Sequence, residues 1–240
     1  MSQNRSDIYD PEFVSGMFDR MSKTYGLANL MTSFGFTSRW RRQCLNDLPK
    51  VKPNSTGYDL MSGMGESWGN IQSKLDKESR IIALDISDEM NKKASEHLKR
   101  LKTKNIDLKK ANILDNDILD NSADFIVSTF GIKTFNEDQQ LKLAREIHRI
   151  LKPNGSFALI EISKPKLYPL KWLYMFYLKI LIPIIGKIFM GNSDDYRMLG
   201  TYCSDFGDSK YFHSCLIDLG VKSIYEKYFF GCATGVYGTK

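Results

Sequence analysis

A glycine-rich turn and a carboxylate that follows it are the residues whose types and spacing most directly suggest chemistry. Asp59-Leu60-Met61-Ser62-Gly63-Met64-Gly65 closes a short apolar stretch, and Asp85 closes the next one, twenty residues after Gly65. Glycine lets a backbone approach a ligand closely, and a carboxylate at the tip of a second strand can accept hydrogen bonds from both hydroxyls of a ribose. The pairing predicts a binding site for a nucleoside cofactor.

The acidic residues of this turn favour one class of nucleoside cofactor. A dinucleotide site needs a third glycine in register and a helix N-terminus that is open to pyrophosphate, but Glu66 follows Gly65 directly. Asp59 and Glu66 would repel a phosphate and suit the ammonium and sulfonium groups of S-adenosylmethionine. We therefore expect S-adenosylmethionine, with Asp85 on its ribose. The alternative is a structural turn followed by a chance carboxylate.

The elements that must position this turn alternate along the chain. Strands are predicted over residues 58–61, 80–85, 106–111, 125–130 and 157–162, with an antiparallel pair near 221–229 and 232–237, and helices over 71–77, 88–101 and 137–151. Because parallel strands need crossover helices, this alternation predicts an α/β fold with a parallel, doubly wound sheet. We expect one domain over residues 1–240, with a helical N-terminal cap (1–53) and a helical insertion on the substrate side (164–212).

The composition excludes several classes of protein. With 42% hydrophobic and 26% charged residues the chain can bury a core, and a net charge of +6 is a mild surface bias, not a nucleic-acid-binding tail. The four cysteines lack C-x-x-C spacing, which predicts reduced thiols in the cytoplasm and no metal centre. Residues 167–190 are strongly apolar, but lysines interrupt them and argue against a transmembrane helix.

Longer motifs make the sequence resemble one family of class I methyltransferases. They are Phe18-Asp19-Arg20, Tyr25-Gly26-Leu27-Ala28-Asn29, Ser33-Phe34-Gly35, the glycine-rich turn, Lys110-Ala111-Asn112, Phe130-Gly131-Ile132, Leu151-Lys152-Pro153-Asn154-Gly155 and Asp194-Asp195-Tyr196-Arg197. In order and spacing they resemble the UbiE-type family, whose members C-methylate ubiquinone and menaquinone precursors. The resemblance implies a Rossmann-like class I methyltransferase fold: a mostly parallel seven-stranded sheet with helices on both faces and additional N-terminal helices. It also implies S-adenosyl-L-homocysteine as a product.

The resemblance assigns expected roles to individual cofactor-binding residues. Those expected around the methionine end of the cofactor are Asp59, Gly63, Met64, Gly65 and Tyr25, the last of them covering the carboxylate. Those expected around the nucleoside are Asp85, Asn112, Ile113 and Thr129. Four positions depart from the family pattern: Met61 and Ser62 replace smaller residues, Met64 stands where the family usually has Thr, and Gly26 stands where it usually has Asp.

The residues expected to face the methyl acceptor depart further. Lys133-Thr134 stands where the family has Arg-Asn, and Thr201-Tyr202-Cys203 where it has Glu-Ser-Ile. Lys133, Tyr196 and Tyr202 are the candidates for steering an acceptor hydroxyl. A lysine beside a sulfonium should have a lowered pKa, which would let Lys133 take a phenolic proton. We expect a hydrophobic phenolic, quinol-like or prenyl-type acceptor that is methylated on carbon. The reaction would belong to a biosynthetic pathway, and secondary metabolism is one candidate.

One alternative function and several partners stay open. The departures also suit a protein that binds S-adenosylmethionine without transferring methyl, such as a cyclase or a scaffold in a biosynthetic complex. No nucleic-acid partner is expected. The aromatic and aliphatic segment 167–190 leaves a peripheral membrane contact open, and a homodimer is open as well.

Overall fold

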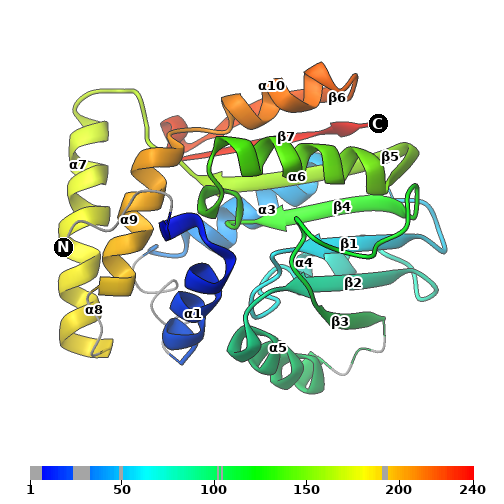
Figure 1. Cartoon of the computed structure of the whole chain (residues 1–240), viewed down its shortest axis with the longest axis horizontal. Helices are drawn as coiled ribbons and strands as arrows, with labels where there is room; N and C mark the ends of the chain where they lie inside the picture. The colour runs from blue at the N-terminus through cyan, green and yellow to red at the C-terminus, as the bar shows by residue number, and fades with distance from the viewer. Residues whose placement is uncertain (1–6, 24–32, 49–50, 102, 104, 191–193) are drawn as a thin grey trace.

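A seven-stranded sheet with the order β3-β2-β1-β4-β5-β7-β6 forms the centre of the fold (Figure 1). The computed structural model describes residues 7–23, 33–48, 51–101, 103, 105–190 and 194–240. The strands are β1 (Thr56–Leu60), β2 (Arg80–Asp85), β3 (Ile106–Lys110), β4 (Ala123–Thr129), β5 (Leu151–Ile162), β6 (Lys222–Tyr228) and β7 (Ala233–Thr239). The first five pair in parallel, and β7 is antiparallel to both β5 and β6. The predicted Rossmann-like class I methyltransferase fold is confirmed.

The central strands are apolar on both faces, as a parallel sheet covered by helices requires. In β4, Phe125, Ile126 and Val127 are all fully buried. Gly57 of β1 lies opposite Phe125 of β4, and a Cβ atom on Gly57 would come within 2.0 Å of the phenyl ring. The absence of a side chain at Gly57 therefore makes room for the aromatic ring in the layer between the sheet and its helices.

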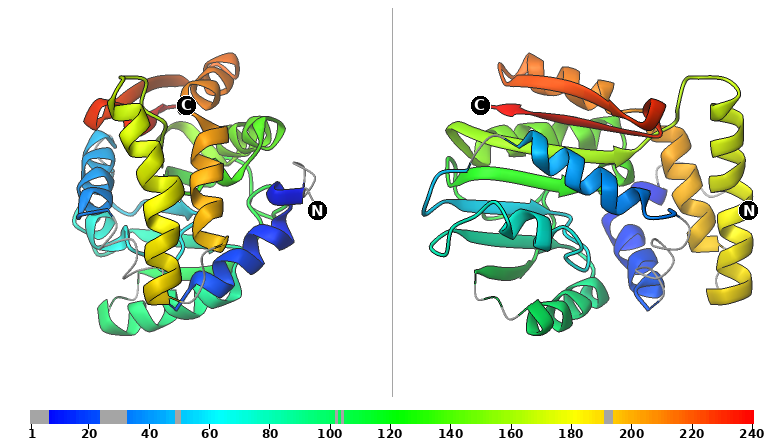
Figure 2. Two further views of the ribbon diagram at one scale, coloured as in Figure 1. Left: turned by 90° about the vertical axis from the view of Figure 1, so that its left-hand side faces the viewer. Right: turned by 180° about the vertical axis from the view of Figure 1, so that it is seen from behind.

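Two layers of helices cover the two faces of the sheet. On one face lie α3 (Phe36–Asp47), α4 (Trp68–Gln72) and α5 (Asp88–Leu101), which contribute Trp40, Trp68 and Ala94 to that core (Figure 2, right). On the other lie α6 (Glu137–Ile150) and α10 (Lys210–Asp218), which contribute Leu143 and Phe212 (Figure 1). Although α3 belongs to the segment predicted as an N-terminal cap, its apolar side packs against the sheet.

A third group of helices stands at the end of the sheet where the parallel strands terminate (Figures 1 and 2). It consists of η1 (Asp7–Tyr9), α1 (Pro11–Met21), α7 (Leu170–Phe176), η3 (Tyr177–Leu181), α8 (Ile182–Met190) and α9 (Asp194–Phe206). The guanidinium of Arg20 donates to both carboxylate oxygens of Asp195, at 3.0 and 2.7 Å, which joins α1 to α9. Asp19 accepts hydrogen bonds from Ser87 Oγ at 2.5 Å and Glu89 N at 2.9 Å, which joins α1 to the start of α5.

The sequence pattern predicts most elements to within about two residues at each end, with two larger differences. The strand 80–85 and the helix 88–101 coincide with β2 and α5. The predicted helix 71–77 is instead α4, Trp68–Gln72, because Asp76 accepts hydrogen bonds from the backbone and hydroxyl of Ser79 and so starts the turn into β2. The predicted strand 157–162 is the second half of the longer β5, Leu151–Ile162. In the described part of the chain, no helix has the length and apolar character needed to cross a membrane.

Candidate active site

The glycine-rich turn and Asp85 are joined directly at the carboxyl ends of β1 and β2. Asp85 accepts hydrogen bonds from the backbone amides of Gly63 at 2.8 Å and Ser87 at 2.9 Å, one on each carboxylate oxygen. Gly63 and Gly65 have φ angles of 56° and 80°, in the left-handed region that favours glycine. The carboxylate therefore holds the turn in place and keeps acceptor capacity on both oxygens for ligand hydroxyls.

A cavity of about 880 Å³, counting its open mouth, lies against this turn. Five of the predicted cofactor-binding residues line it: Gly63, Asp85, Asn112, Ile113 and Thr129. Further lining residues, which the sequence pattern does not indicate, come from η1, α1, α3 and α6: Tyr9, Val14, Phe18, Arg41 and Gln139. The ends of β2, β3 and β4 thus meet the N-terminal helices around a single space.

Buried polar groups of this cavity fit the methionine end of S-adenosylmethionine. Arg41 is 6% exposed, and its Nη2 lies 3.4 Å from Oε1 of Glu66. Arg41 Nε and Ser62 Oγ are buried without a hydrogen-bond partner among the described residues. A buried donor without a partner is costly, so a ligand carboxylate suits Arg41, and a ligand ammonium suits Glu66. Tyr25, predicted to cover that carboxylate, lies outside the described residues.

The carboxyl group of Asp85 has a pKa raised to about 6. Burial is the main cause, and the negative charges of Asp19 and Glu66 add to it. The backbone amides of Ser87 and Gly63 act in the opposite direction, because they stabilise the carboxylate. Two ribose hydroxyls would add two more donors to the ionised form, so cofactor binding should favour deprotonated Asp85.

Three predicted cofactor-binding residues of the glycine-rich turn contact Trp68 or His97. Asp59 is buried and accepts a hydrogen bond from Trp68 Nε1 at 3.0 Å, and burial raises its pKa to about 7. A Cβ atom on Gly65 would come within 2.3 Å of the Trp68 ring. The carbonyl of Met64 lies 3.0 Å from Nδ1 of His97, whose ring stacks on Trp68. These contacts hold the glycine-rich turn against Trp68 and His97. Contact of Asp59, Met64 and Gly65 with the cofactor stays a prediction.

A second, larger cavity of about 1310 Å³ adjoins the first. Its walls are mostly aromatic and aliphatic side chains of α3, α7, η3, α8 and α9: Phe36, Trp40, Leu170, Tyr174, Tyr177, Leu178, Ile182 and Leu199. Phe130 lines both cavities, directly after β4, with a left-handed φ of 69°. Because Phe130 lines both cavities, it separates the two spaces. Its ring centroid lies 5.0 Å from the Arg41 guanidinium.

Lys133 and Tyr196, two of the predicted acceptor-steering residues, line the second cavity. The Lys133 side chain is 3% exposed and its Nζ donates to Glu161 Oε1 at 2.9 Å and to the Phe130 carbonyl at 2.7 Å. Glu161, 0% exposed, also accepts from the Lys133 backbone amide at 3.0 Å. Both acceptor oxygens are bound to Nζ of Lys133, so a role as a base toward a methyl acceptor would require this contact to separate.

Tyr202, the third predicted acceptor-steering residue, points elsewhere. It is buried, its hydroxyl donates to the backbone carbonyl of Ile8, and its ring packs against Tyr9 with centroids 5.6 Å apart. Burial raises the pKa of its hydroxyl above the ordinary value. Tyr202 thereby joins α9 to η1, and a role toward an acceptor stays a prediction.

The comparison with known proteins identifies the family. A model of the ubiE/COQ5 methyltransferase family matches residues 5–240. The chain belongs to this family. It is 26% identical over 230 residues to a demethylmenaquinone methyltransferase of Bacillus mycoides, covering 95% of this chain and 96% of that protein.

Solved structures agree on the fold. The fold is similar to that of a SAM-dependent methyltransferase from Aquifex aeolicus, with a TM-score of 0.56 and 20% identity over 79% of this chain and 84% of that one. It is also similar to a Haemonchus contortus phosphoethanolamine N-methyltransferase in complex with S-adenosyl-L-methionine, with a TM-score of 0.57 and 16% identity over 79% of this chain and 38% of that one. The protein is a methyltransferase that depends on S-adenosylmethionine.

Two charged residues of the site could have been found in the sequence. Glu161 is the one charged residue within the apolar stretch Phe157–Ile162, and a carboxylate in a buried strand needs a cationic partner. Arg41 lies on the apolar side of α3 with Trp40, Cys44 and Leu45, where an arginine is unusual. Each charged residue can be noticed from its own apolar segment, but its partner lies far away in the sequence: Glu161 pairs with Lys133, and Arg41 pairs with Glu66.

The two glycines of the turn should differ in their response to alanine. Both have positive φ, which costs about 1–2 kcal/mol with a Cβ, and only Gly65→Ala meets a ring at 2.3 Å, whereas the nearest atom to Gly63→Ala is Glu66 Oε2 at 3.6 Å. Urea unfolding should show a loss of about 2–5 kcal/mol for Gly65→Ala. Gly63→Ala should lower the stability only by the cost of its positive φ, but it should weaken cofactor binding. Equal losses of stability would contradict this assignment.

Cofactor affinity should fall as the pH drops through about 6, because protonated Asp85 loses acceptor capacity for the ribose hydroxyls. Calorimetry should find Asp85→Ala weaker by about 1–3 kcal/mol at pH 8. Asp85→Asn should bind the cofactor weakly, and its affinity should not change between pH 5 and pH 8, a range that includes the Asp85 pKa of about 6.

Asp59→Asn is the control for this titration, because Asp59 also has a raised pKa but bonds Trp68 behind the turn. It should keep the pH dependence of cofactor affinity. If the dependence disappears in Asp59→Asn and persists in Asp85→Asn, the ribose is not held by Asp85.

Proposed function

We propose that this methyltransferase C-methylates a hydrophobic phenolic or quinol-like acceptor that occupies the larger cavity. The observation that carries the proposal is the apolar space of about 1310 Å³ that meets the cofactor cavity at Phe130. Its few polar groups include Lys133 and Tyr196, which suits a molecule with a polar ring and an apolar body. The name of the Bacillus relative, demethylmenaquinone methyltransferase, indicates an acceptor of this class.

The chain's own residues would align the acceptor and exclude water. Bound S-adenosylmethionine would supply an electrophilic methyl group: a ring carbon would gain the C–CH₃ bond as the S–CH₃ bond breaks, S-adenosylhomocysteine would be the leaving group, and the ring carbon would then lose its proton to solvent. The Lys133 ammonium, fixed by Glu161, would stabilise the negative charge on an ionised acceptor hydroxyl. The aromatic walls would hold the ring against Phe130 and keep water from the reacting carbon.

Membership of the family favours a transferase over a protein that binds the cofactor without transferring methyl. The cytoplasmic location, the homodimer and a role in secondary metabolism stay predictions.

A panel of acceptors tests the proposal. Formation of S-adenosylhomocysteine should be fastest with prenylated naphthoquinols and prenylated phenols, slower with the tailless naphthoquinol, and absent with tailless phenol and with catechol, which lack an apolar body. The tail should raise kcat/KM because it fills the apolar cavity. Equal turnover of tailed and tailless rings, or turnover of catechol alone, would contradict the proposed acceptor class.

The buried ion pair gives a second test. Lys133→Met leaves Glu161 charged and buried, which should destabilise the protein by about 3–5 kcal/mol, so this variant alone cannot separate folding from chemistry. Lys133→Met with Glu161→Gln removes both charges and should recover most of the thermal stability. If the Lys133 ammonium steers the acceptor, this double variant should keep cofactor affinity and lose about two to three orders of magnitude in kcat. Turnover as in the unmodified protein would show that the pair is structural only.

A further inference from the structure

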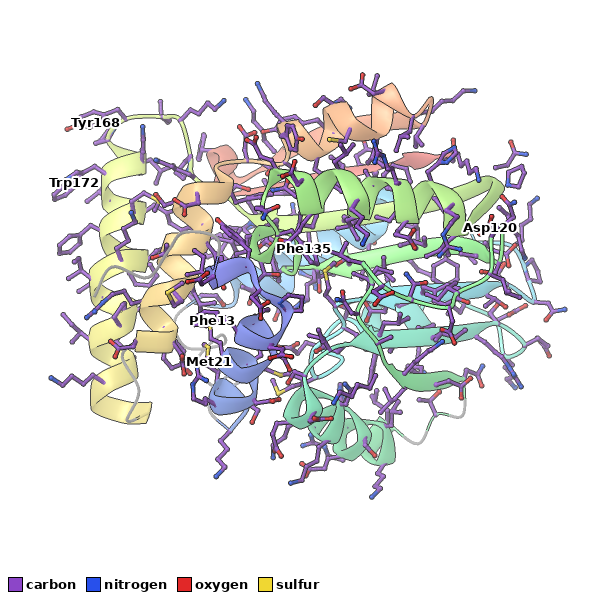
Figure 3. All side chains as sticks on the ribbon, viewed as in Figure 1. Phe13, Met21, Asp120, Phe135, Tyr168 and Trp172 are labelled. Carbon is purple, nitrogen blue, oxygen red and sulfur yellow. The ribbon has the colours of Figure 1, made fainter. Side chains whose placement is uncertain are left out.

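The helix formed by α7, η3 and α8 exposes large apolar side chains to solvent. Trp172, Phe176, Ile180 and Ile184 follow one another at four-residue steps, and each is exposed. Trp172 and Phe176 stack on each other at 5.7 Å, outside the body of the protein. Figure 3 shows Tyr168 and Trp172 projecting away from the sheet, at the outer side of this helix. A contiguous face of this kind marks an interaction site.

The charged residues of segment 164–190 all have one sign. Residues 164–190 contain five lysines and no aspartate or glutamate. Lys171, Lys179 and Lys187 are exposed on the helix itself, and Lys166 pairs with Asp208 at 3.2 Å. An exposed apolar face with aromatic residues and lysines beside it is the pattern of a helix that lies in the interface of an anionic lipid bilayer.

The opposite side of the same helix forms a wall of the proposed acceptor cavity. Leu170, Tyr174, Tyr177, Leu178 and Ile182 line that cavity, whereas Trp172, Phe176, Ile180 and Ile184 are not among its lining residues. Figure 2 shows the helix standing at the outer end of the molecule, beyond the sheet edge where the cavities lie. One helix therefore separates the cavity from the exposed apolar face.

We propose that the exposed face of α7–η3–α8 docks onto an anionic lipid surface, so that a bilayer-dissolved acceptor enters the larger cavity directly. The proposal rests on the proposed function for its acceptor. A second copy of the chain fits the face less well, because a two-fold interface would bring the lysines of both copies together. A lipid surface with negative headgroups supplies both an apolar layer and the opposite charge.

Vesicle flotation of the full chain, without acceptor or cofactor, tests the docking. The protein should float with vesicles of equal parts phosphatidylcholine and phosphatidylglycerol, and much less with phosphatidylcholine alone. Ile180→Ser with Ile184→Ser should weaken binding about tenfold or more, because two apolar side chains no longer enter the interface. Lys171→Gln with Lys187→Gln should weaken it about fivefold for each charge removed.

Matched controls lie on α10 and β6. Ile217 and Ile224 are 47% and 53% exposed, against 45% and 47% for Ile180 and Ile184. Ile217→Ser with Ile224→Ser, and Lys222→Gln with Lys227→Gln, should float as the unmodified protein does. No binding by the unmodified protein, or equal losses in the control pairs, would overturn the proposal. Conversion of a dimer to a monomer by Ile180→Ser with Ile184→Ser would overturn it too, because the face would then be a self-association surface.

Turnover separates this inference from the proposed function. With a short-chain acceptor in solution, Ile180→Ser with Ile184→Ser should turn over as fast as the unmodified protein. With a long-chain prenylated acceptor in anionic vesicles, its turnover should fall about tenfold. Equal rates in vesicles would overturn the docking role and leave the acceptor class standing. Vesicle binding without turnover on any phenol or quinol would overturn the acceptor class and leave the lipid surface standing.

Discussion

The buried contact between Lys133 and Glu161 fixes the segment that lies between the two cavities. Glu161 lies in β5 and accepts hydrogen bonds from the backbone amide and the ammonium of Lys133, which follows β4. A charge in this position is tolerated only when it is paired and hydrogen-bonded, so the two residues fix the short helical turn Ile132–Thr134 beside the sheet. Gly131 and Thr134 then line the cofactor cavity while Lys133 lines the other one.

The backbone at Phe130 shows what this interaction achieves. Its φ of 69° is unfavourable for a bulky residue, yet its amide donates to the Ile160 carbonyl at 2.8 Å and its own carbonyl accepts from Lys133 Nζ. The strained conformation is held from both sides, and it places the ring under Arg41 between the two cavities. Backbone strain that the surrounding structure maintains is common at functional sites. Here the strained residue, Phe130, separates the two cavities between which a methyl group would pass.

The sequence predicts what local patterns determine. Apolar strands and crossover helices are periodic, so the sheet and the position of Asp85 at the end of β2 follow from the sequence. The partners of buried charges are not periodic: Glu161 meets Lys133 only through the pairing of β4 with β5, and Asp59 meets Trp68 only because the turn folds back. Sequence reasoning therefore finds the glycine-rich turn but not the tryptophan beneath it.

The N-terminal helix α1 shows how the two sides of the site are coupled. Val14 lines the cofactor cavity, and the helix is held to the core by Asp19 at the start of α5. Its other anchor is Arg20, which binds Asp195, and the next residue, Tyr196, lines the larger cavity. The Arg20 side chain is about half exposed, so this ion pair adds little stability, but its two hydrogen bonds fix the relative orientation of α1 and α9. Any movement of α1 that opens the cofactor cavity must therefore shift α9 as well, or break that pair.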